Sequence, residues 1–208
     1  MSTIEDELLV KRAAAGKQDA FEQLLTRYQS QIYRLCFRMA GNADDAQDLA
    51  QESFIKAWRN LPGFRYDCAF STWLYRLTSN VCLDFLRAKK RRQVISLTVE
   101  SEDGEEALLD VPDVQPLPEE QVLTCDERSR LSRAMSLLEP QQRQLLTLRV
   151  VNDLSYAEIA SALEIKEGTV KSRLSRAREA LRKKYEKIGN ESTAPASNKQ
   201  KGGRNNAV

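Results

Sequence analysis

The middle of the chain constrains its fold most, because residues 93–127 contain eleven acidic side chains and no lysine or arginine. As far as residue 118 this stretch also holds three of the six prolines and no aromatic residue. Such a segment cannot bury enough apolar surface to offset its conformational entropy. We therefore predict a flexible acidic linker over residues 93–118 between two domains, residues 1–92 and 119–187. The polar tail, residues 188–208, is predicted to be disordered.

Charge is distributed unevenly along the 208 residues. The formal net charge of +2 conceals +4 over residues 1–92, −11 over 93–127 and +7 over 128–187. Segregation of this kind indicates a polyanionic partner for the two basic parts.

Hydrophobic periodicity on both sides of the linker is that of helices, and glycine and proline are sparse before residue 95. Apolar residues recur three and four positions apart, which places them on one face of a helix. The sequence thus predicts an all-α protein with two small helical domains. The expected helices cover residues 4–14, 18–40, 43–60, 69–91, 119–137, 140–151, 155–163 and a segment that begins near 167.

Several functional classes are disfavoured by what the sequence lacks. It has no histidine, the commonest general base and metal ligand, and no nucleotide-binding glycine motif. Its four cysteines are scattered without a CxxC pair, so we expect reduced, packed thiols in a cytoplasmic protein. No apolar run is long enough to span a membrane. We expect no catalytic site, no metal, no cofactor and no membrane insertion.

Residues 155–184 have the pattern of a helix-turn-helix. Ser155 and Glu158 form a capping box that opens the first helix, and residues 164–166 form the turn. The second helix buries a stripe of Val170, Leu174 and Ala177 and presents a basic front. A solvated basic helix would also be rich in charge, but the cap, turn and stripe together favour DNA binding. In such motifs the start of the second helix reaches base edges in the major groove.

Residues 64–92 interleave aromatic and cationic side chains. Eight of the fourteen aromatic residues lie between residues 54 and 85, with arginines and lysines among them. Bases of a single strand stack on aromatic rings while basic groups meet the phosphates, each stack contributing roughly 1–3 kcal/mol. The alternative is a helical-bundle core, and the residues alone leave both possibilities open. The cluster consists of Phe64, Tyr66, Phe70, Trp73 and Tyr75.

The helix expected over residues 43–60 carries an acidic face opposite its buried stripe. An acidic face repels phosphate, so it faces water or a protein, and taken alone water is favoured. Paired carboxylates on one exposed face, without histidine, are a poor basis for catalysis. The face consists of Asp45, Asp48, Gln51, Glu52 and Ile55.

Three stretches together resemble the extracytoplasmic-function (ECF) sigma factors of bacteria, members of the sigma-70 family. They are NADDAQDLAQESFIKAWRN, FSTWLYRLTSNVCLDFLRAKKRR and LSYAEIASALEIKEGTVKSRLSRAREAL. The resemblance implies that the first domain is sigma region 2 and the second is sigma region 4. It also implies binding to core RNA polymerase (the β′ clamp helices and the β subunit) and to promoter DNA, and restraint by an anti-sigma factor.

The resemblance assigns roles to residues at matching positions. It implies that the acidic face Asp45, Asp48, Gln51, Glu52 and Ile55 docks on polymerase. It implies contacts to the −10 promoter element from Phe64, Arg65, Phe70, Ser71, Trp73, Arg76, Asn80 and Asp84. It implies contacts to the −35 element from Thr169, Lys171, Ser172, Arg173, Ser175 and Arg176.

Two positions depart from the family pattern. Lys166 stands where proline often precedes Glu-Gly-Thr-Val, and Ser175 stands where relatives often carry an aromatic residue or histidine. Two rival functions are weighed against a sigma factor. A regulator that binds duplex DNA alone leaves the aromatic loop and the acidic face unexplained. A nucleic-acid-processing enzyme lacks an acidic constellation for two-metal catalysis.

Overall fold

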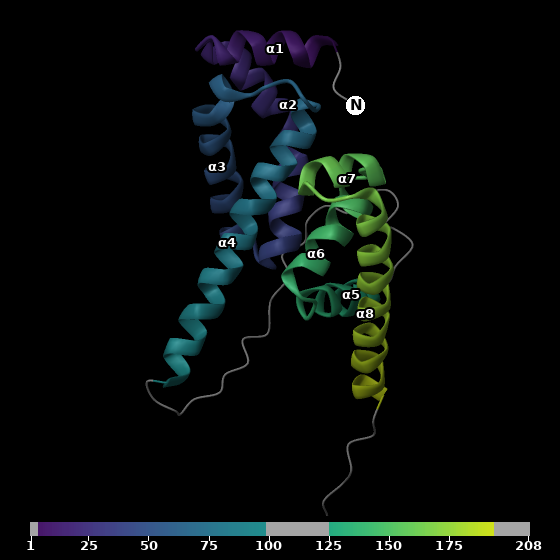
Figure 1. Cartoon of the computed structure of the whole chain (residues 1–208). Coiled ribbons are helices and arrows are strands. Elements are labelled where there is room, and N and C mark those ends of the chain that lie inside the picture. The colour runs from purple at the N-terminus through teal and green to yellow at the C-terminus, as the bar shows by residue number, and fades with distance from the viewer. Residues whose placement is uncertain (1–3, 99–124, 194–208) are drawn as a thin grey trace, which may run out of the picture.

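The computed structural model describes residues 4–98 and 125–193, and every regular element in these ranges is helical (Figure 1). The prediction of an all-α fold is confirmed. The amino-terminal unit consists of α1 (Ile4–Ala14), α2 (Gln18–Ala40), α3 (Ala43–Asn60), the short 3₁₀ helix η1 (Leu61–Gly63) and α4 (Phe70–Thr98).

Local sequence signals explain how α2 ends and α3 begins. Gly41 adopts a left-handed backbone with φ of 87°, a conformation that suits glycine. The side chain of Asn42 then accepts a hydrogen bond of 2.8 Å from the N–H of Asp45, which satisfies a free donor in the first turn of α3. The two helices consequently pack side by side in an antiparallel hairpin.

The core of this unit is formed by large aliphatic side chains from all its long helices. Leu24, Ile32 and Leu35 of α2 are almost completely buried, as are Met39 and Leu74. Burial of each such side chain contributes roughly 1.5–3 kcal/mol. The amphipathic faces predicted from periodicity are thus the faces that meet in the core.

The carboxy-terminal unit consists of α5 (Cys125–Ser136), α6 (Pro140–Leu146), the π-helical turn η3 (Thr147–Val151), α7 (Tyr156–Leu163) and α8 (Glu167–Thr193). The predicted capping box is present: the N–H of Ser155 donates to the Glu158 carboxylate, at 2.8 Å, and the N–H of Glu158 donates to the Ser155 hydroxyl, at 3.2 Å. Glu164, with φ of 53°, ends α7 in the left-handed region. Pro140 occupies the first turn of α6, where its missing N–H costs nothing.

Two helices continue farther than the sequence analysis predicted. Helix α4 extends through Thr98, into the segment expected to be linker, because no glycine or proline interrupts residues 64–98. Helix α8 extends through Thr193, into the segment expected to be a disordered tail. The rest of the predicted linker and tail lies outside the described residues, as do residues 119–124 of the helix expected over 119–137.

Packing against α5 explains the length of α8. The guanidinium of Arg130 donates two hydrogen bonds, at 2.9 and 2.8 Å, to the carbonyl oxygen of Tyr185 and lies 4.0 Å from the centre of the Tyr185 ring. A Cβ at Gly189 would collide with this guanidinium. Together with the buried Ile188, these contacts stabilise the last turns of α8, and periodicity within α8 alone does not reveal them.

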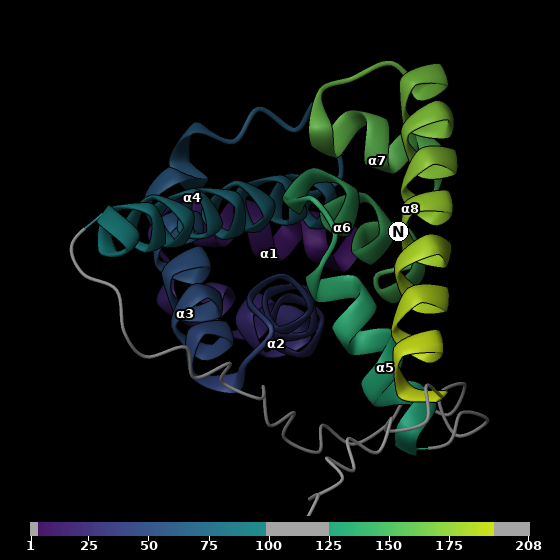
Figure 2. The ribbon, with the colours of Figure 1, turned by 90° about the horizontal axis from the view of Figure 1, so that it is seen from below.

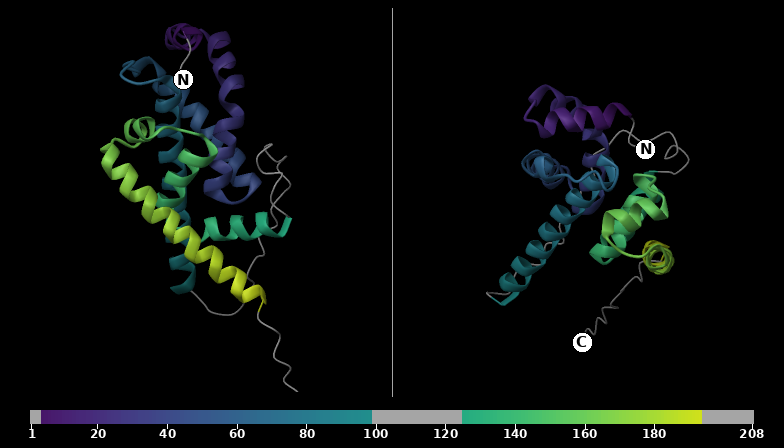
Figure 3. Two further views of the ribbon diagram at one scale, coloured as in Figure 1. Left: turned by 90° about the vertical axis from the view of Figure 1, so that its right-hand side faces the viewer. Right: turned by 45° about the horizontal axis from the view of Figure 1, so that its top comes forward.

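The two units lie against each other. Figures 2 and 3 show α8 along the outer edge of the molecule, with α5, α6 and α7 between it and the amino-terminal helices. Helices α6 and α7 contact α4, and α6 and η3 contact α2. The buried side chains of both units form one connected apolar cluster.

Candidate polymerase and promoter-DNA surfaces

The acidic face of α3 is largely open to solvent. Asp48, Gln51, Glu52 and Ile55 are exposed, and Ile55 retains 44% of its surface accessible although it is apolar. Asp45 differs, since it is half-buried, accepts from Asn42 and forms an ion pair of 3.2 Å with Lys89 of α4. Four of the five predicted polymerase contacts therefore form a continuous exposed patch, while Asp45 helps to fasten α3 to α4.

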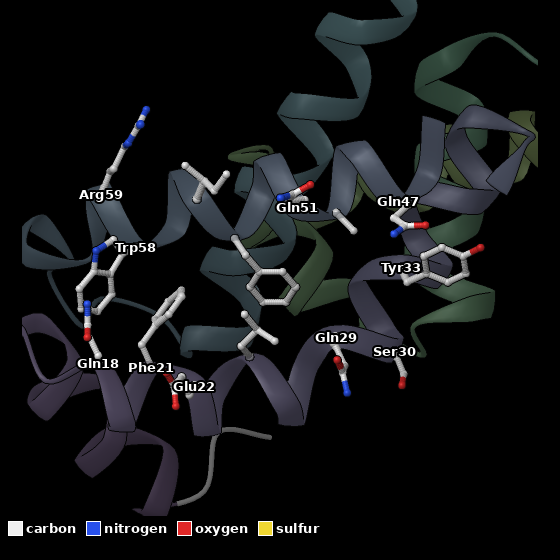
Figure 4. Close-up of a pocket in the computed structure, with 14 residues that line it drawn as sticks. Gln18, Phe21, Glu22, Gln29, Ser30, Tyr33, Gln47, Gln51, Trp58 and Arg59 are labelled. Atoms are coloured by element: carbon white, nitrogen blue, oxygen red, sulfur yellow. The ribbon is translucent and has the colours of Figure 1, made fainter. Parts of the chain in front are cut away.

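A groove of about 1010 Å³ runs beside this patch between α2 and α3 (Figure 4). Its floor is apolar, with Phe21 and Trp58 in contact at 5.0 Å between ring centres, and its rim is rich in glutamine. Gln51 and Ile55 belong both to the groove and to the acidic face. The sequence analysis missed the α2 side of this surface because Phe21 and Tyr33 read as ordinary core positions of an amphipathic helix.

The aromatic loop before α4 is a packed cluster. Phe64 and Phe70 are buried, with 8% and 3% of their surfaces exposed, and both contact the half-buried Trp73 at 5.3 and 5.7 Å between ring centres. Ser71 is buried as well. The bundle-core alternative thus describes Phe64 and Phe70 in this conformation, where neither presents a free ring face to a nucleotide.

Tyr66 is the aromatic residue that the loop exposes. It has 46% of its surface accessible and contacts Phe64 with the rings tilted and their centres 4.8 Å apart. Its φ of 60° is uncommon for a bulky residue. The sequence analysis counted Tyr66 in the cluster but not among the predicted contacts, because composition does not tell which ring of a loop faces water. Arg65 beside it is exposed.

The remaining predicted −10 residues follow one side of α4. Asn80 and Asp84 are exposed and one helical turn apart, and Asp84 pairs with Arg87 at 2.9 Å. Farther along α4 lies an exposed basic run, Lys89, Lys90, Arg91 and Arg92. Arg76 is engaged instead, since its guanidinium lies 2.6 Å from the carboxylate of Glu164 in the carboxy-terminal unit.

The predicted −35 residues share the solvent face of α8. Lys171, Ser172, Arg173, Ser175 and Arg176 are exposed, and Thr169 is half-buried in the first turn. The opposite face is closed, since Val170, Leu174 and Ala177 are completely buried against α6 and α7. Lys171 forms an intrahelical pair with Glu167 at 3.0 Å, whereas no ion pair involves Arg173 or Arg176 within the described part of the chain.

Two of the described cysteines lie side by side in the core of the amino-terminal unit. Cys36 and Cys82 are buried, and the Cys82 thiol donates a hydrogen bond to the sulfur of Cys36 over 3.8 Å. This hydrogen bond and burial both raise the pKa of Cys82. These are packed thiols, as predicted.

Within residues 4–98 and 125–193, no helix is long and apolar enough to cross a membrane.

Comparison with known proteins identifies both units. Residues 24–92 match the family model for sigma-70 region 2, and residues 128–181 match that for sigma-70 region 4. The ECF RNA polymerase sigma factor SigW of Bacillus subtilis is 37% identical over 174 residues, which are 84% of this chain and 93% of SigW. The RNA polymerase sigma-H factor of Pseudomonas aeruginosa is 39% identical over 183 residues, 86% of this chain and 93% of the relative.

A solved structure supports the same assignment. The sigma factor RpoE of Bartonella quintana, in complex with the anti-sigma factor NepR, superimposes with a TM-score of 0.61 and 25% identity over 80% of this chain and 96% of RpoE. Sequence, family models and fold thus agree over both units. The chain belongs to the ECF sigma factors of the sigma-70 family.

Proposed function

We propose that this chain directs core RNA polymerase to promoters through three separate surfaces and has no catalytic activity of its own. The observation that carries the proposal is the division of α8 into a completely buried apolar face and an exposed basic face, beside a second unit with an acidic face on α3. The basic face of α8 suits duplex DNA and the acidic face of α3 suits a protein, as a sigma factor requires. We further propose that it acts in the cytoplasm, where polymerase transcribes.

The −35 element is read by the start of α8. Arg176 and Arg173 are exposed and suit the guanine edge in the major groove, whereas Ser172 and Ser175 suit several bases. Lys183 and Lys184, farther along α8, suit phosphates, which position the protein without specifying sequence.

The −10 element is held by the loop over residues 64–69 and by α4. Tyr66 and Arg65 supply an exposed ring and a cation beside it, a combination that favours an unstacked base and its phosphate. The Asn80 amide offers a paired donor and acceptor to a base edge, and the Asp84 carboxylate offers an acceptor for cytosine. Extruding a base costs a few kcal/mol, and holding the extruded base offsets that cost, so binding favours the open strand.

Core polymerase docks on the exposed part of the acidic face, Asp48, Gln51, Glu52 and Ile55. An isolated acidic patch on a DNA-binding protein would repel phosphate, whereas a basic protein surface would complement it. Ile55, exposed and part of the lining of the α2–α3 groove, supplies apolar contact at the carboxy-terminal end of this patch. An anti-sigma factor is a further proposed partner, since the related RpoE has been solved with NepR.

Run-off transcription tests the proposal. Purified chain is added to core polymerase on genomic fragments, and new transcripts are mapped to their start sites. A sigma factor yields new starts that share two sequence elements upstream. A regulator that binds duplex DNA alone yields none without another sigma factor, and a nuclease yields cleaved template when Mg²⁺ is supplied.

A further inference from the structure

A polar cavity of about 430 Å³ lies where α1, α2, the start of α4 and the stretch from the end of η3 into α7 meet. Its volume is within the range of roughly 300–1,000 Å³ that is usual for small-molecule sites. Of the residues that line it, only Ser71 belongs to the predicted polymerase or promoter contacts. The proposed function therefore leaves this cavity unexplained.

Two buried amide oxygens in the cavity wall have no hydrogen-bond donor. They are Gln31 Oε1 and Asn152 Oδ1, and no donor in the described part of the chain reaches either of them. The orientation of the Asn152 amide is fixed, because its Nδ2 donates to the carbonyl oxygen of Gln31 at 3.2 Å. Since buried acceptors are normally paired, these two oxygens point to a bound molecule that carries donors.

Two hydroxyl groups from the first turn of α4 also line the cavity. Thr72 and Ser71 have only 3% and 8% of their surfaces exposed. Neither hydroxyl hydrogen-bonds to another group among residues 4–98 and 125–193. Valine would fill the space of Thr72 without a polar atom, so packing alone does not require a hydroxyl here.

The charge of the wall indicates that the donors belong to a cation. Four carboxylates and one guanidinium line the cavity, and that guanidinium, of Arg27, pairs with two of the four carboxylates. A second guanidinium, of Arg149, lies 3.6 Å from a third carboxylate, so carboxylates still exceed cations by two. Such a wall attracts a positive ligand and repels an anion. The four carboxylates belong to Glu5, Asp6, Asp153 and Glu158.

An organic ammonium ion suits this wall better than a metal ion. Within the described residues, no group of three or more histidine, cysteine, aspartate or glutamate side chains is placed to hold a metal. A primary ammonium group carries three N–H donors and no acceptor, as in lysine, which matches a wall of oxygen acceptors. Leu154, Tyr28 and Tyr75 also line the cavity and supply apolar surface for methylene groups.

We propose that this cavity binds a small aliphatic amine, whose ammonium group donates to Gln31 Oε1, Asn152 Oδ1 and the Thr72 hydroxyl and is attracted by the surrounding carboxylates. Gln31 and Thr72 belong to the amino-terminal unit, and Asn152 belongs to the carboxy-terminal unit, so the bound amine contacts both. The inference goes beyond the proposed function and does not depend on it, because binding requires neither polymerase nor DNA.

Calorimetric titration of the full chain with putrescine, a four-carbon diamine, tests the proposal. Putrescine should bind at one site per chain. Tetramethylammonium has the charge but no N–H donor, and 1,4-butanediol has hydroxyl donors but no charge, so both should bind at least tenfold more weakly. Absence of putrescine binding would overturn the proposal, since water would then be the partner of these oxygens. Equal binding of putrescine and tetramethylammonium would overturn it as well, because the donors would play no part.

A charge-removing double variant tests whether the amine lies in this cavity. Glu5→Gln with Asp153→Asn removes two carboxylates of the wall, and asparagine tolerates the left-handed backbone of position 153, where φ is 52°. This variant should weaken putrescine binding at least tenfold. The control, Glu7→Gln with Asp126→Asn, removes two exposed carboxylates outside the cavity and should change the affinity less than twofold.

Thr72→Val removes one acceptor while keeping the shape of the side chain, and it should weaken putrescine binding at least threefold. Circular dichroism checks that each variant is folded. Equal losses for the two double variants would overturn the proposal, because the amine would then be attracted by the overall acidity of the chain, which has eleven acidic side chains in residues 93–127.

Nuclear magnetic resonance of the parent chain locates the amine without any substitution. Addition of putrescine should shift the side-chain amide signals of Gln31 and Asn152, and it should leave those of the exposed Gln23 and Asn80 unchanged. Signals of Gln31 and Asn152 that stay in place at saturating putrescine would overturn the proposal, even if a variant used in the titrations failed to fold.

Discussion

Arg143 of α6 and Met39 of α2 are 104 positions apart in sequence and joined by a hydrogen bond of 2.7 Å between the guanidinium Nη1 and the carbonyl oxygen. The same guanidinium donates to the carbonyl oxygens of Ser136 and Leu138. It thus joins the α5–α6 turn to the carboxy-terminal end of α2, where helix carbonyls lack partners and cations are favoured. Burial lowers the pKa of Arg143, yet arginine stays charged at any physiological pH.

Removal of this guanidinium should destabilise the whole chain. Arg143→Met leaves three carbonyl groups without their donor, and a buried unsatisfied group costs roughly 1–3 kcal/mol. We expect a loss of about 2 kcal/mol or more in the free energy of unfolding, measured with urea. Arg133→Met, on an exposed position of α5, is the control and should change stability by no more than about 0.5 kcal/mol. Equal effects of the two would show that the Arg143 contacts contribute nothing specific.

Arg176 is expected to discriminate bases. A bidentate contact to guanine predicts that Arg176→Ala weakens binding to the −35 element by roughly 1–3 kcal/mol and relaxes preference at one position. Lys183→Ala should weaken binding equally on native and scrambled elements. Holoenzyme binding to both DNAs, measured at fixed salt, checks this. Equal loss on both DNAs for Arg176→Ala would reduce its role to a phosphate contact.

Trp73 has a packing role and a proposed role in strand opening, and the two can be separated. It is half-buried against Phe64 and Phe70, so Trp73→Ala should destabilise the amino-terminal unit by roughly 3 kcal/mol as well as impair strand opening. Trp73→Phe keeps apolar packing and should recover most of the stability. Permanganate footprinting of melted thymines then reports opening alone. Normal opening by a stable Trp73→Phe variant would limit Trp73 to packing.

The capping box gives the carboxy-terminal unit a defined pH dependence. Hydrogen bonds from the Ser155 hydroxyl and N–H hold the pKa of Glu158 below its ordinary value of 4.5. Because the folded pKa is depressed, the stabilisation is complete above the unfolded pKa and is lost as the pH falls through the folded pKa.

Glu158→Gln should accordingly lower stability at pH 7 by roughly 0.5–1 kcal/mol, and the difference should vanish in acid below the lowered pKa. Thermal or urea unfolding across this pH range makes the comparison. Glu186→Gln, on the exposed surface of α8, should show little effect at either pH. A deficit for Glu158→Gln that persists in acid would exclude the charged cap as its cause.

Thiol reactivity should follow burial. Cys36 and Cys82 are completely buried and the pKa of Cys82 is raised, so neither supplies thiolate readily. Burial also raises the pKa of Cys68, but its partial exposure should make it the first of these three to react with iodoacetamide. Peptide mapping at mild alkaline pH checks the order. Early modification of Cys82 would show that α4 opens readily from α2.

Local signals predicted the helices well, and contacts between distant residues explain what they missed. Asn42 caps the start of α3 and the Ser155–Glu158 box caps the start of α7, and each of these signals involves residues only three positions apart. The stripe of Val170 and Leu174 is buried, as its spacing predicts. The extension of α8 depends on Arg130 of α5, more than fifty positions away. No periodicity encodes such a contact.

The candidate sites divide in the same way. The basic face of α8 and the acidic face of α3 follow from helical spacing and are exposed, except that Thr169 and Asp45 are half-buried. The loop over residues 64–69 is irregular, so sequence could not tell that Phe64 packs inward against Phe70 of α4 while Tyr66 is exposed. Sequence also could not reveal that Arg76 meets Glu164, since the two residues belong to different units.

Binding to core RNA polymerase tests the central claim most directly. Labelled chain is titrated with core enzyme at modest salt, beside a variant in which Asp48→Lys and Glu52→Lys reverse charge on the exposed face of α3, with Glu186→Lys as the charge control. A sigma factor should bind core tightly, lose at least tenfold in affinity through the α3 variant and lose little through the control. A correctly folded parent chain that shows no binding to core at modest salt would contradict the assignment of these surfaces.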